Sequence, residues 1–181
     1  MTAARAGDPS GFEGLVARYS TLAHRTAVLF GAGSDADDVA QEAFVKAFRS
    51  LDRLREDGSF RAWLLSIVVN ETSNLRRAAK RRSNLAVRLA LQPEGRQAPV
   101  PEAAVMAGER RARLLAAIDR LPERDRAVVT CRYLLELSEA ETVQALGWPA
   151  GTVKSTLSRA LRRLQALLAV EASGAAEVTR G

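Results

Sequence analysis

The spacing of apolar residues constrains the fold of this chain most strongly, because it follows the period of an α-helix. Apolar side chains recur every three or four residues in several stretches, among them residues 39–51, 60–68, 114–121 and 153–168. This spacing places them on one face of a helix. The alternation typical of strands is not evident, and the abundant Ala, Leu, Arg and Glu favour helices. The sequence therefore predicts an all-α fold.

A proline-rich segment near the middle of the chain divides the helical pattern in two. Residues 92–101 contain three prolines and one glycine without apolar periodicity, which is typical of a linker. Each half is close to the smallest size at which a domain can build its own core. We therefore expect two small helical domains joined by a flexible linker. The expected boundaries are a first domain at 8–90, a linker at 91–104, a second domain at 105–171 and a tail at 172–181.

Composition and charge narrow the class of partner. The 181 residues include 27 Lys and Arg against 21 Asp and Glu, a formal net charge of +6. This charge favours an anionic partner, although it does not distinguish nucleic acid from a membrane surface. One cysteine excludes an internal disulfide framework, and one histidine argues against a metalloenzyme. No apolar run approaches the roughly 18 residues of a membrane span, so we expect a cytoplasmic protein without membrane insertion. We also expect no metal and no cofactor.

The second half contains a predicted helix-turn-helix. Ser138 and Glu141 have the spacing of a capping box, which starts a helix that we expect to end at Gly147. A short turn follows, and the next helix is expected to begin around Thr152, a good N-cap residue. In a helix-turn-helix the second helix enters the major groove of DNA.

This second helix is predicted to have one apolar and one polar face. Residues 150–165 include four basic residues and no acidic one. Lys and Arg side chains can donate to guanine or phosphate, and Ser and Thr to either. The charge alone fits a solvated amphipathic helix equally well, but the capping box and the turn favour DNA binding. The predicted DNA-binding residues are Thr152, Lys154, Ser155, Thr156, Ser158, Arg159 and Arg162.

The first half contains an acidic surface at the start of its second predicted helix. Carboxylates at a helix N-terminus complement the helix dipole and need no partner. Here the polar stripe continues past the first turn, which favours a protein partner because DNA would repel it. The residues of this acidic stripe are Asp37, Asp38, Gln41 and Glu42.

A basic surface follows in the same half. Residues 71–88 include six Arg or Lys and one acidic residue. A charge run is often only a solvated face, but the amides that flank this one match base edges, and arginine can contact phosphate or stack on bases. A basic helix in each half suggests that both engage one nucleic acid, with the linker raising the effective concentration of the second. The residues of this basic stripe are Asn70, Asn74, Arg76, Arg77, Lys80 and Arg81.

At these residues the sequence resembles the extracytoplasmic-function (ECF) sigma factors of bacterial RNA polymerase, within the sigma-70 family. The resemblance covers roughly residues 10–170. It implies two helical domains, called region 2 and region 4, in a non-enzymatic protein that directs the polymerase to promoters. The segments that carry it, in chain order, are Asp37–Phe44, Phe60–Leu64, Asn70, Leu121–Arg124, Leu137–Glu141 and Gly151–Ser155.

The resemblance also implies a role for each surface. By similarity, the acidic stripe would bind the clamp helices of the largest polymerase subunit. Asn70 and Asn74 would open and recognise the minus-10 element, and the arginines and lysine of the basic stripe would support the melted strand. The predicted residues of the second helix would recognise the minus-35 element. The linker would run toward the RNA exit path, region 4 would meet the polymerase flap, and an anti-sigma factor would hold the protein inactive.

The chain departs from the family pattern at positions that bear on promoter sequence. Leu65 and Ser66 stand where a Tyr-Arg pair is frequent, and Asn74 stands where Asp is frequent. In the second helix, Thr156 replaces a frequent Arg and Ser158 a bulkier residue. We expect these changes to leave the fold intact.

Two other functions compete with this hypothesis. A stand-alone helix-turn-helix regulator would bind a specific duplex tightly without polymerase, but it leaves the acidic and basic stripes unexplained. A nucleic-acid enzyme with a helical tail would need a carboxylate cluster or a Cys/His site, and the dense carboxylates here are expected at an exposed helix end. Cys131 and His24, the single cysteine and histidine, are both predicted to be packing residues.

Overall fold

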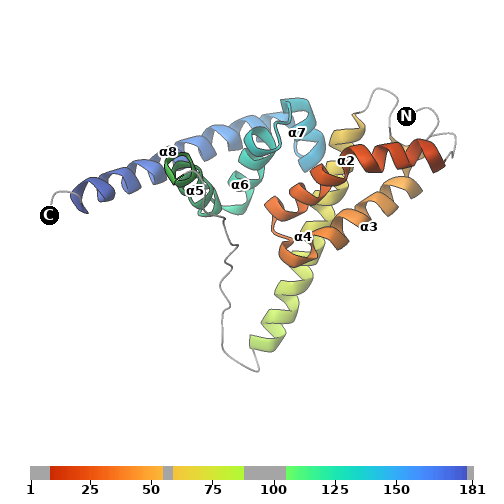
Figure 1. Ribbon diagram of the computed structural model, residues 1–181, viewed down its shortest axis with the longest axis horizontal. Coiled ribbons are helices and arrows are strands. Elements are labelled where there is room, and N and C mark those ends of the chain that lie inside the picture. Colours follow the sequence, from red (N-terminus) through yellow and green to blue (C-terminus); the bar gives the residue numbers. More distant parts are fainter. Residues whose placement is uncertain (1–8, 55–58, 88–104, 179–181) are drawn as a thin grey trace.

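The computed structural model describes residues 9–54, 59–87 and 105–178, and these are helical throughout apart from short turns (Figure 1). The all-α prediction is confirmed. The expected linker at 91–104 lies outside the described residues, as do the ends of the chain at 1–8 and 179–181.

The first domain consists of three mutually packed helices. Helix α2 spans Pro9–Phe30, α3 spans Ala36–Arg49 and α4 spans Phe60–Val87, with short 3-10 turns at Gly33–Asp35 and Leu51–Arg53 on either side of α3. Figure 1 shows α4 extending well beyond the other two helices.

The core of the first domain follows the predicted apolar face. Val39 and Ala43 of α3 and Leu64 of α4 are buried together, as the spacing predicted. Phe48, at the border of this face, is 47% exposed and meets the Phe12 ring edge-on, with ring centroids 5.0 Å apart. The helical period thus predicted the centre of the core better than its border.

The second domain is built on one long helix. Helices α5 (Val105–Asp119), α6 (Glu123–Val129) and α7 (Glu139–Leu146) all pack against α8 (Ala150–Val178). A π-helical turn at Thr130–Leu134 extends α6 toward α7. The core of this domain joins α5, α6 and α8, with Ile118, Val128 and Val153 all buried.

Helices α7 and α8 form the predicted helix-turn-helix. The Ser138 hydroxyl accepts a hydrogen bond from the Glu141 backbone N–H at 3.2 Å, and the Glu141 carboxylate accepts one from the Ser138 N–H at 2.9 Å. This reciprocal pair is the predicted capping box. Gly147 ends α7 with a φ of 66°, a left-handed conformation that glycine adopts without a Cβ penalty.

Both ends of α8 differ from the prediction. The helix begins at Ala150 rather than near Thr152, because the Pro149 carbonyl already accepts hydrogen bonds from the backbone N–H groups of Thr152 and Val153. It also continues to Val178, through most of the segment expected to be a frayed tail. Residues 172–178 include three alanines, and alanine has the highest intrinsic helix propensity.

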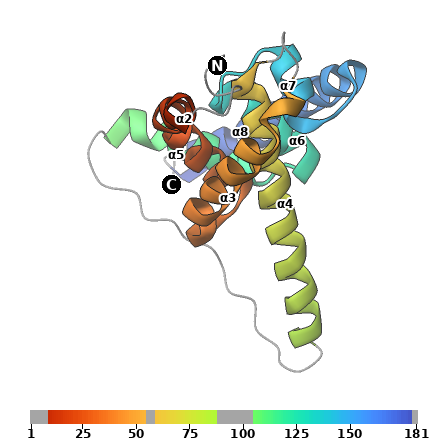
Figure 2. The same cartoon turned by 90° about the vertical axis from the view of Figure 1, so that its right-hand side faces the viewer.

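The two domains pack against each other, with α4 of the first against α7 of the second (Figure 2). Leu65 of α4 is fully buried in a cluster with Cys131, Leu135 and Leu137 of the second domain. We call this cluster the domain interface. Burial of Cys131 is as predicted, and it raises the pKa of the thiol to about 12, so the side chain remains an uncharged thiol at neutral pH.

Two arginines of the first domain add polar contacts to the domain interface. Arg25 donates a hydrogen bond to the Leu134 carbonyl at 2.8 Å, and Arg61 donates one to the Leu135 carbonyl at 2.6 Å. Both carbonyls lie at the end of the π-helical turn, where backbone acceptors lack partners within the helix. The first domain therefore caps a helical end of the second.

Candidate polymerase and nucleic-acid interfaces

The acidic stripe lies along the outer face of α3. The helix buries Val39, Ala40 and Ala43, and this turns all four predicted side chains to the solvent. The exposed Val45 continues the same face by one turn. The stripe therefore presents carboxylates and one apolar side chain to the solvent. Its predicted members are Asp37, Asp38, Gln41 and Glu42.

One member of the acidic stripe has a partner that the sequence did not predict. His24 of α2 lies with its Nδ1 2.7 Å from Oδ1 of Asp37, and its side chain is 45% exposed. The interpretation of His24 as a packing residue is therefore wrong. The two residues are 13 positions apart on different helices, so no helical spacing could reveal the contact.

Lys46 links the acidic stripe to α4. Its Nζ lies 2.6 Å from Glu71 of α4 and 3.4 Å from Glu42 of the stripe. The hydrogen bond to Glu71 raises the pKa of Lys46 above its ordinary value, against a smaller opposing effect of burial. A groove runs alongside this contact and is lined by Asp38 and Glu42 on one side and by Asn74 and Arg81 on the other. The acidic and basic stripes are thus neighbours on one domain.

The basic stripe follows one side of α4. The side chains of Asn70, Asn74, Arg77, Lys80 and Arg81 are exposed, as expected from the helical spacing. Within the stripe, Arg77 donates a hydrogen bond to the Asn74 side-chain oxygen at 2.8 Å. One amide of the stripe is therefore already oriented by a neighbouring cation.

Arg76 differs from the other cations of the basic stripe because the second domain holds it. Its Nη1 lies 2.7 Å from Oε1 of Glu123, the first residue of α6, and 3.5 Å from the Phe30 carbonyl. The Arg76 side chain is 36% exposed and that of Glu123 is 69% exposed. An ion pair this exposed contributes at most about 1 kcal/mol to domain packing.

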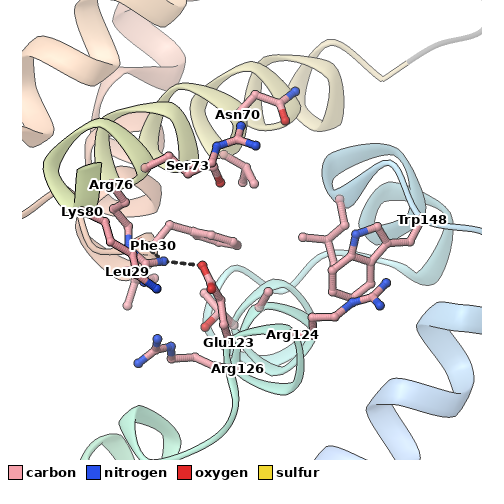
Figure 3. Close-up of a pocket in the computed structure, with 15 residues that line it drawn as sticks. Leu29, Phe30, Asn70, Ser73, Arg76, Lys80, Glu123, Arg124, Arg126 and Trp148 are labelled. Carbon is pink, nitrogen blue, oxygen red and sulfur yellow. Dashed lines mark hydrogen bonds and ion pairs between the residues drawn. The ribbon is translucent and has the colours of Figure 1, made fainter. Parts of the chain in front are cut away.

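A cleft of about 580 Å³ lies where the second domain faces the basic stripe (Figure 3). Asn70 and Lys80 line it from α4, and Arg124 and Trp148 line it from the second domain. The Arg124 guanidinium lies 4.7 Å from the centre of the Trp148 ring, which is a cation–π contact. The cleft has a cationic and partly aromatic lining, and part of the basic stripe faces protein rather than open solvent.

The polar face of α8 is open along most of its predicted length. Lys154, Ser155, Ser158, Arg159 and Arg162 are exposed, and Thr152 is half-buried. Lys154 lies 3.4 Å from Glu139 of α7, and its side chain remains 68% exposed.

Thr156 does not belong to the exposed face of α8. Its side chain is only 3% exposed, and its hydroxyl accepts a hydrogen bond from Arg159 at 3.4 Å. The prediction that Thr156 offers its side chain to DNA is wrong. At 100° per residue the position lies at the border of the apolar face, where sequence alone could not decide its exposure.

A buried carboxylate beside α8 was missed in the sequence. Asp125 of α6 is only 2% exposed, and its Oδ1 lies 3.3 Å from Nη2 of Arg159. Its Oδ2 accepts a hydrogen bond from Arg163, which lies one turn after Arg159 on α8. Arg159 and Arg163 follow Asp125 by 34 and 38 positions in the sequence. Helical spacing could not reveal contacts between residues so far apart.

The part of the chain that the structure describes offers no support for a metal centre or a membrane span. Among these residues, no three His, Cys, Asp or Glu side chains lie close enough together to hold a metal ion. None of the described helices is both long and apolar enough to cross a membrane.

Family comparisons cover both domains. Residues 15–82 match the model of sigma-70 region 2, and residues 111–164 match that of sigma-70 region 4. The ECF RNA polymerase sigma-E factor of Escherichia coli K12 is 35% identical over 164 residues, which cover 85% of this chain and 84% of that protein. The corresponding factor of Haemophilus influenzae is 31% identical over 88% of each chain.

Solved structures show the same architecture. CnrH, solved in complex with the cytosolic domain of CnrY, is 28% identical and superposes with a TM-score of 0.68 over 93% of this chain and 94% of CnrH. The sigma factor RpoE of Bartonella quintana, solved with the anti-sigma factor NepR, is 21% identical and superposes with a TM-score of 0.70 over 88% of this chain and 98% of that one.

Proposed function

Because the chain belongs to the ECF sigma factors of the sigma-70 family, and so directs promoter-specific transcription by RNA polymerase, we propose that its surfaces divide this task among three contacts. The acidic stripe binds core polymerase, the basic stripe binds the minus-10 element, and α8 binds the minus-35 element. One observation carries this proposal: the predicted side chains on α3, α4 and α8 are exposed, apart from Thr156 and the partly covered Thr152 and Arg76, in a chain that matches both sigma regions.

The acidic stripe suits a basic protein surface. Its carboxylates lie at the start of α3, where the helix dipole favours them, and Val45 adds an apolar contact at the edge. We propose that Asp37, Asp38, Gln41 and Glu42 bind the clamp helices of the largest polymerase subunit. DNA bound to the neighbouring basic stripe would avoid these carboxylates, so the charge pattern also keeps the two partners apart.

The basic stripe suits a single strand of DNA. Its arginines and lysine can neutralise phosphates, and the Asn70 and Asn74 amides can pair with the edges of unstacked bases. We propose that both amides recognise the minus-10 element, while Arg76, Arg77, Lys80 and Arg81 support the melted strand. Trp148 lines the same cleft as Asn70, and it lies two residues before α8 begins.

This proximity implies that the domains separate at the promoter. The minus-10 and minus-35 elements lie about 25 base pairs apart, or about 85 Å at about 3.4 Å per base pair. The two DNA-binding surfaces cannot span this distance while Asn70 and Trp148 line one cleft. We propose that polymerase binding opens the domain interface, with region 4 moving to the flap and the linker running toward the RNA exit path.

The protein is proposed to act in the cytoplasm and not to be an enzyme. We also propose that an anti-sigma factor holds it inactive. This part rests on the relatives, since CnrH was solved with CnrY and the Bartonella factor with the anti-sigma factor NepR.

A run-off transcription assay tests the proposed function. Purified bacterial core polymerase would be combined with the full-length protein and a fragmented genomic template, and the start sites of dependent transcripts would be mapped. We expect discrete transcripts that disappear with the charge-reversal variant Asp38→Lys, because that variant no longer binds polymerase. The variant Asp52→Lys, which changes an exposed acidic residue outside the acidic stripe by the same charge, should retain them.

A stand-alone regulator predicts a different result. Such a protein would bind one duplex tightly in a gel-shift assay without polymerase, and Asp38→Lys would leave that binding unchanged. Failure of the wild-type protein to bind core polymerase would overturn the proposed function.

A further inference from the structure

The carboxylate of Asp125 is nearly sealed from solvent and faces two arginines of α8. Its side chain is 2% exposed, whereas those of Arg159 and Arg163 are 46% and 49% exposed. A buried carboxylate without a cationic partner would be costly, so these arginines are held to it rather than moving freely in solvent. Asp125 therefore restricts side chains that α8 alone would leave mobile.

The contacts to Arg159 engage only part of its guanidinium group. Nε lies 3.4 Å from Oδ1 of Asp125, and Nη2 lies 3.3 Å from the same oxygen and 3.4 Å from the Thr156 hydroxyl. Arg159 carries five N–H donors in a fixed planar arrangement. The side of the group that carries Nε and Nη2 is occupied by Asp125 and Thr156, which leaves the two N–H donors of Nη1 for an acceptor outside the protein.

We infer that Asp125 is a positioning residue for promoter recognition, which holds Arg159 so that Nη1 meets the acceptor edge of a guanine in the minus-35 element. The inference rests on the proposed function and adds a residue that does not itself touch DNA. Arginine is suited to guanine O6 and N7 in the major groove. An ordered arginine loses less side-chain entropy on binding than a mobile one, so the buried carboxylate raises discrimination at one base pair.

If Asp125 acted only through its negative charge, its removal would strengthen DNA binding rather than reduce recognition. Removal of a negative charge beside a DNA-binding helix strengthens binding to all sequences, because repulsion of the phosphates falls. If Asp125 instead positions Arg159, its removal lowers the base preference at one position of the minus-35 element and leaves the base preference at the other positions unchanged. The two effects can therefore be separated by measuring base preference rather than affinity alone.

The test is transcription by holoenzyme reconstituted from core polymerase and the full-length protein, on a promoter that the wild-type protein uses. Each base pair of the minus-35 element would be substituted in turn, and initial transcript yields compared. With Arg159→Ala, we expect about a tenfold loss of preference at one position, the scale of a single base contact. Asp125→Ala should lose most of the same preference, and the nearly isosteric Asp125→Asn part of it.

Asp119→Asn is the matched control. Asp119 is a carboxylate of the same domain, 3.7 Å from Arg126, and its substitution changes the charge as Asp125→Asn does. It should leave every base preference unchanged. The double variant Asp125→Ala with Arg159→Ala should show no further loss beyond Arg159→Ala, since both changes remove one contact. Thermal unfolding of each variant would confirm that it is folded at the assay temperature.

Unchanged base preference in a folded Asp125→Ala protein would overturn the inference, as would a loss spread evenly over all positions. Promoter-dependent transcripts from the wild-type protein would still support the proposed function in both cases. Absence of such transcripts from the wild-type protein would overturn the proposed function itself.

Discussion

The two proposed DNA-binding surfaces are held in different ways. Arg159 of α8 is held by Asp125 from within its own domain, and the α8 polar face is exposed apart from the half-buried Thr152. Arg76 of the basic stripe is held by Glu123 from the other domain, and Asn70 shares a cleft with Trp148. One surface is therefore organised by its own fold, whereas the other depends on how the domains sit together. Separation of the domains should change DNA binding by the basic stripe and leave the α8 face as it is.

The domain interface gives the largest expected effect. Leu65 is fully buried between the domains, so Leu65→Asp would place a charge in an apolar cluster and cost several kcal/mol of domain packing. We expect the two domains to separate in small-angle X-ray scattering. We also expect the free protein to bind a single-stranded minus-10 oligonucleotide at least tenfold more tightly, while binding of a minus-35 duplex stays within twofold.

Leu114→Asp is the control for this variant, because Leu114 is an apolar residue of the second domain that is already 38% exposed. It should leave the scattering profile and both affinities unchanged. An unchanged scattering profile for a folded Leu65→Asp protein would show that this side chain does not hold the domains together. Equal gains for both DNA probes would contradict the distinction between the two surfaces.

The salt dependence of DNA binding provides the next comparison, between Arg162 of α8 and Lys80 of the basic stripe. Each cation that contacts a phosphate makes the logarithm of the binding constant fall more steeply with the logarithm of salt concentration, by about 0.7 for single strands and about 0.9 for duplex DNA. Arg162→Ala should lower the slope for a minus-35 duplex by about 0.9 in the wild-type and Leu65→Asp backgrounds alike. Lys80→Ala should lower the slope for a minus-10 single strand by about 0.7, but only in the Leu65→Asp background.

Fluorescence anisotropy at four or more salt concentrations would give these slopes. Arg53→Ala, which removes an exposed cation outside both DNA-binding surfaces, is the control and should leave both slopes unchanged. An equal Lys80 effect in both backgrounds would mean that the domain interface does not restrict the basic stripe.

The residues behind this comparison were only partly predictable from the sequence. The exposed stripes on α3 and α4 and the capping box of α7 depend on neighbours within one helix, and the helical period placed them correctly. The partners of Arg76 and Arg159 lie 47 and 34 positions away, and they meet only because of how the helices pack. Leu65 could be recognised as a departure from the family pattern, but its burial in the domain interface follows from the second domain alone.

Removal of the ion pair between the domains should have a smaller effect than disruption of the apolar cluster. Glu123→Gln releases Arg76, and an exposed ion pair of this kind contributes at most about 1 kcal/mol. We therefore expect a gain of about two- to fivefold in the affinity for the minus-10 single strand, measured by anisotropy. Glu13→Gln, an exposed acidic residue on α2, controls for the change in net charge and should give less than half of this gain. A larger effect of Glu123→Gln than of Leu65→Asp would reverse the proposed importance of the two contacts.

Acid should weaken the domain interface through Glu141, and this is the smallest effect we expect. Burial by itself would raise the pKa of this carboxyl, but the hydrogen bonds from Ser138 and the charge of Arg61, 3.5 Å away across the interface, outweigh it and lower the pKa. A carboxyl with a lowered pKa in the folded protein contributes stability above its unfolded pKa of about 4.3, and this stability is lost as the pH falls through the folded value.

Thermal unfolding between pH 7 and pH 3 would measure this contribution. Glu141→Gln removes the titrating group, so its melting temperature should fall less steeply with acid than that of the wild-type protein below about pH 4.3. The variant Arg61→Met keeps the capping box but loses the charge across the interface, and its acid dependence should lie between the two. If Arg61→Met instead matches the wild-type protein, the acid response belongs to the capping box of α7 alone. The Arg61 contact across the domain interface would then make no contribution to the acid response.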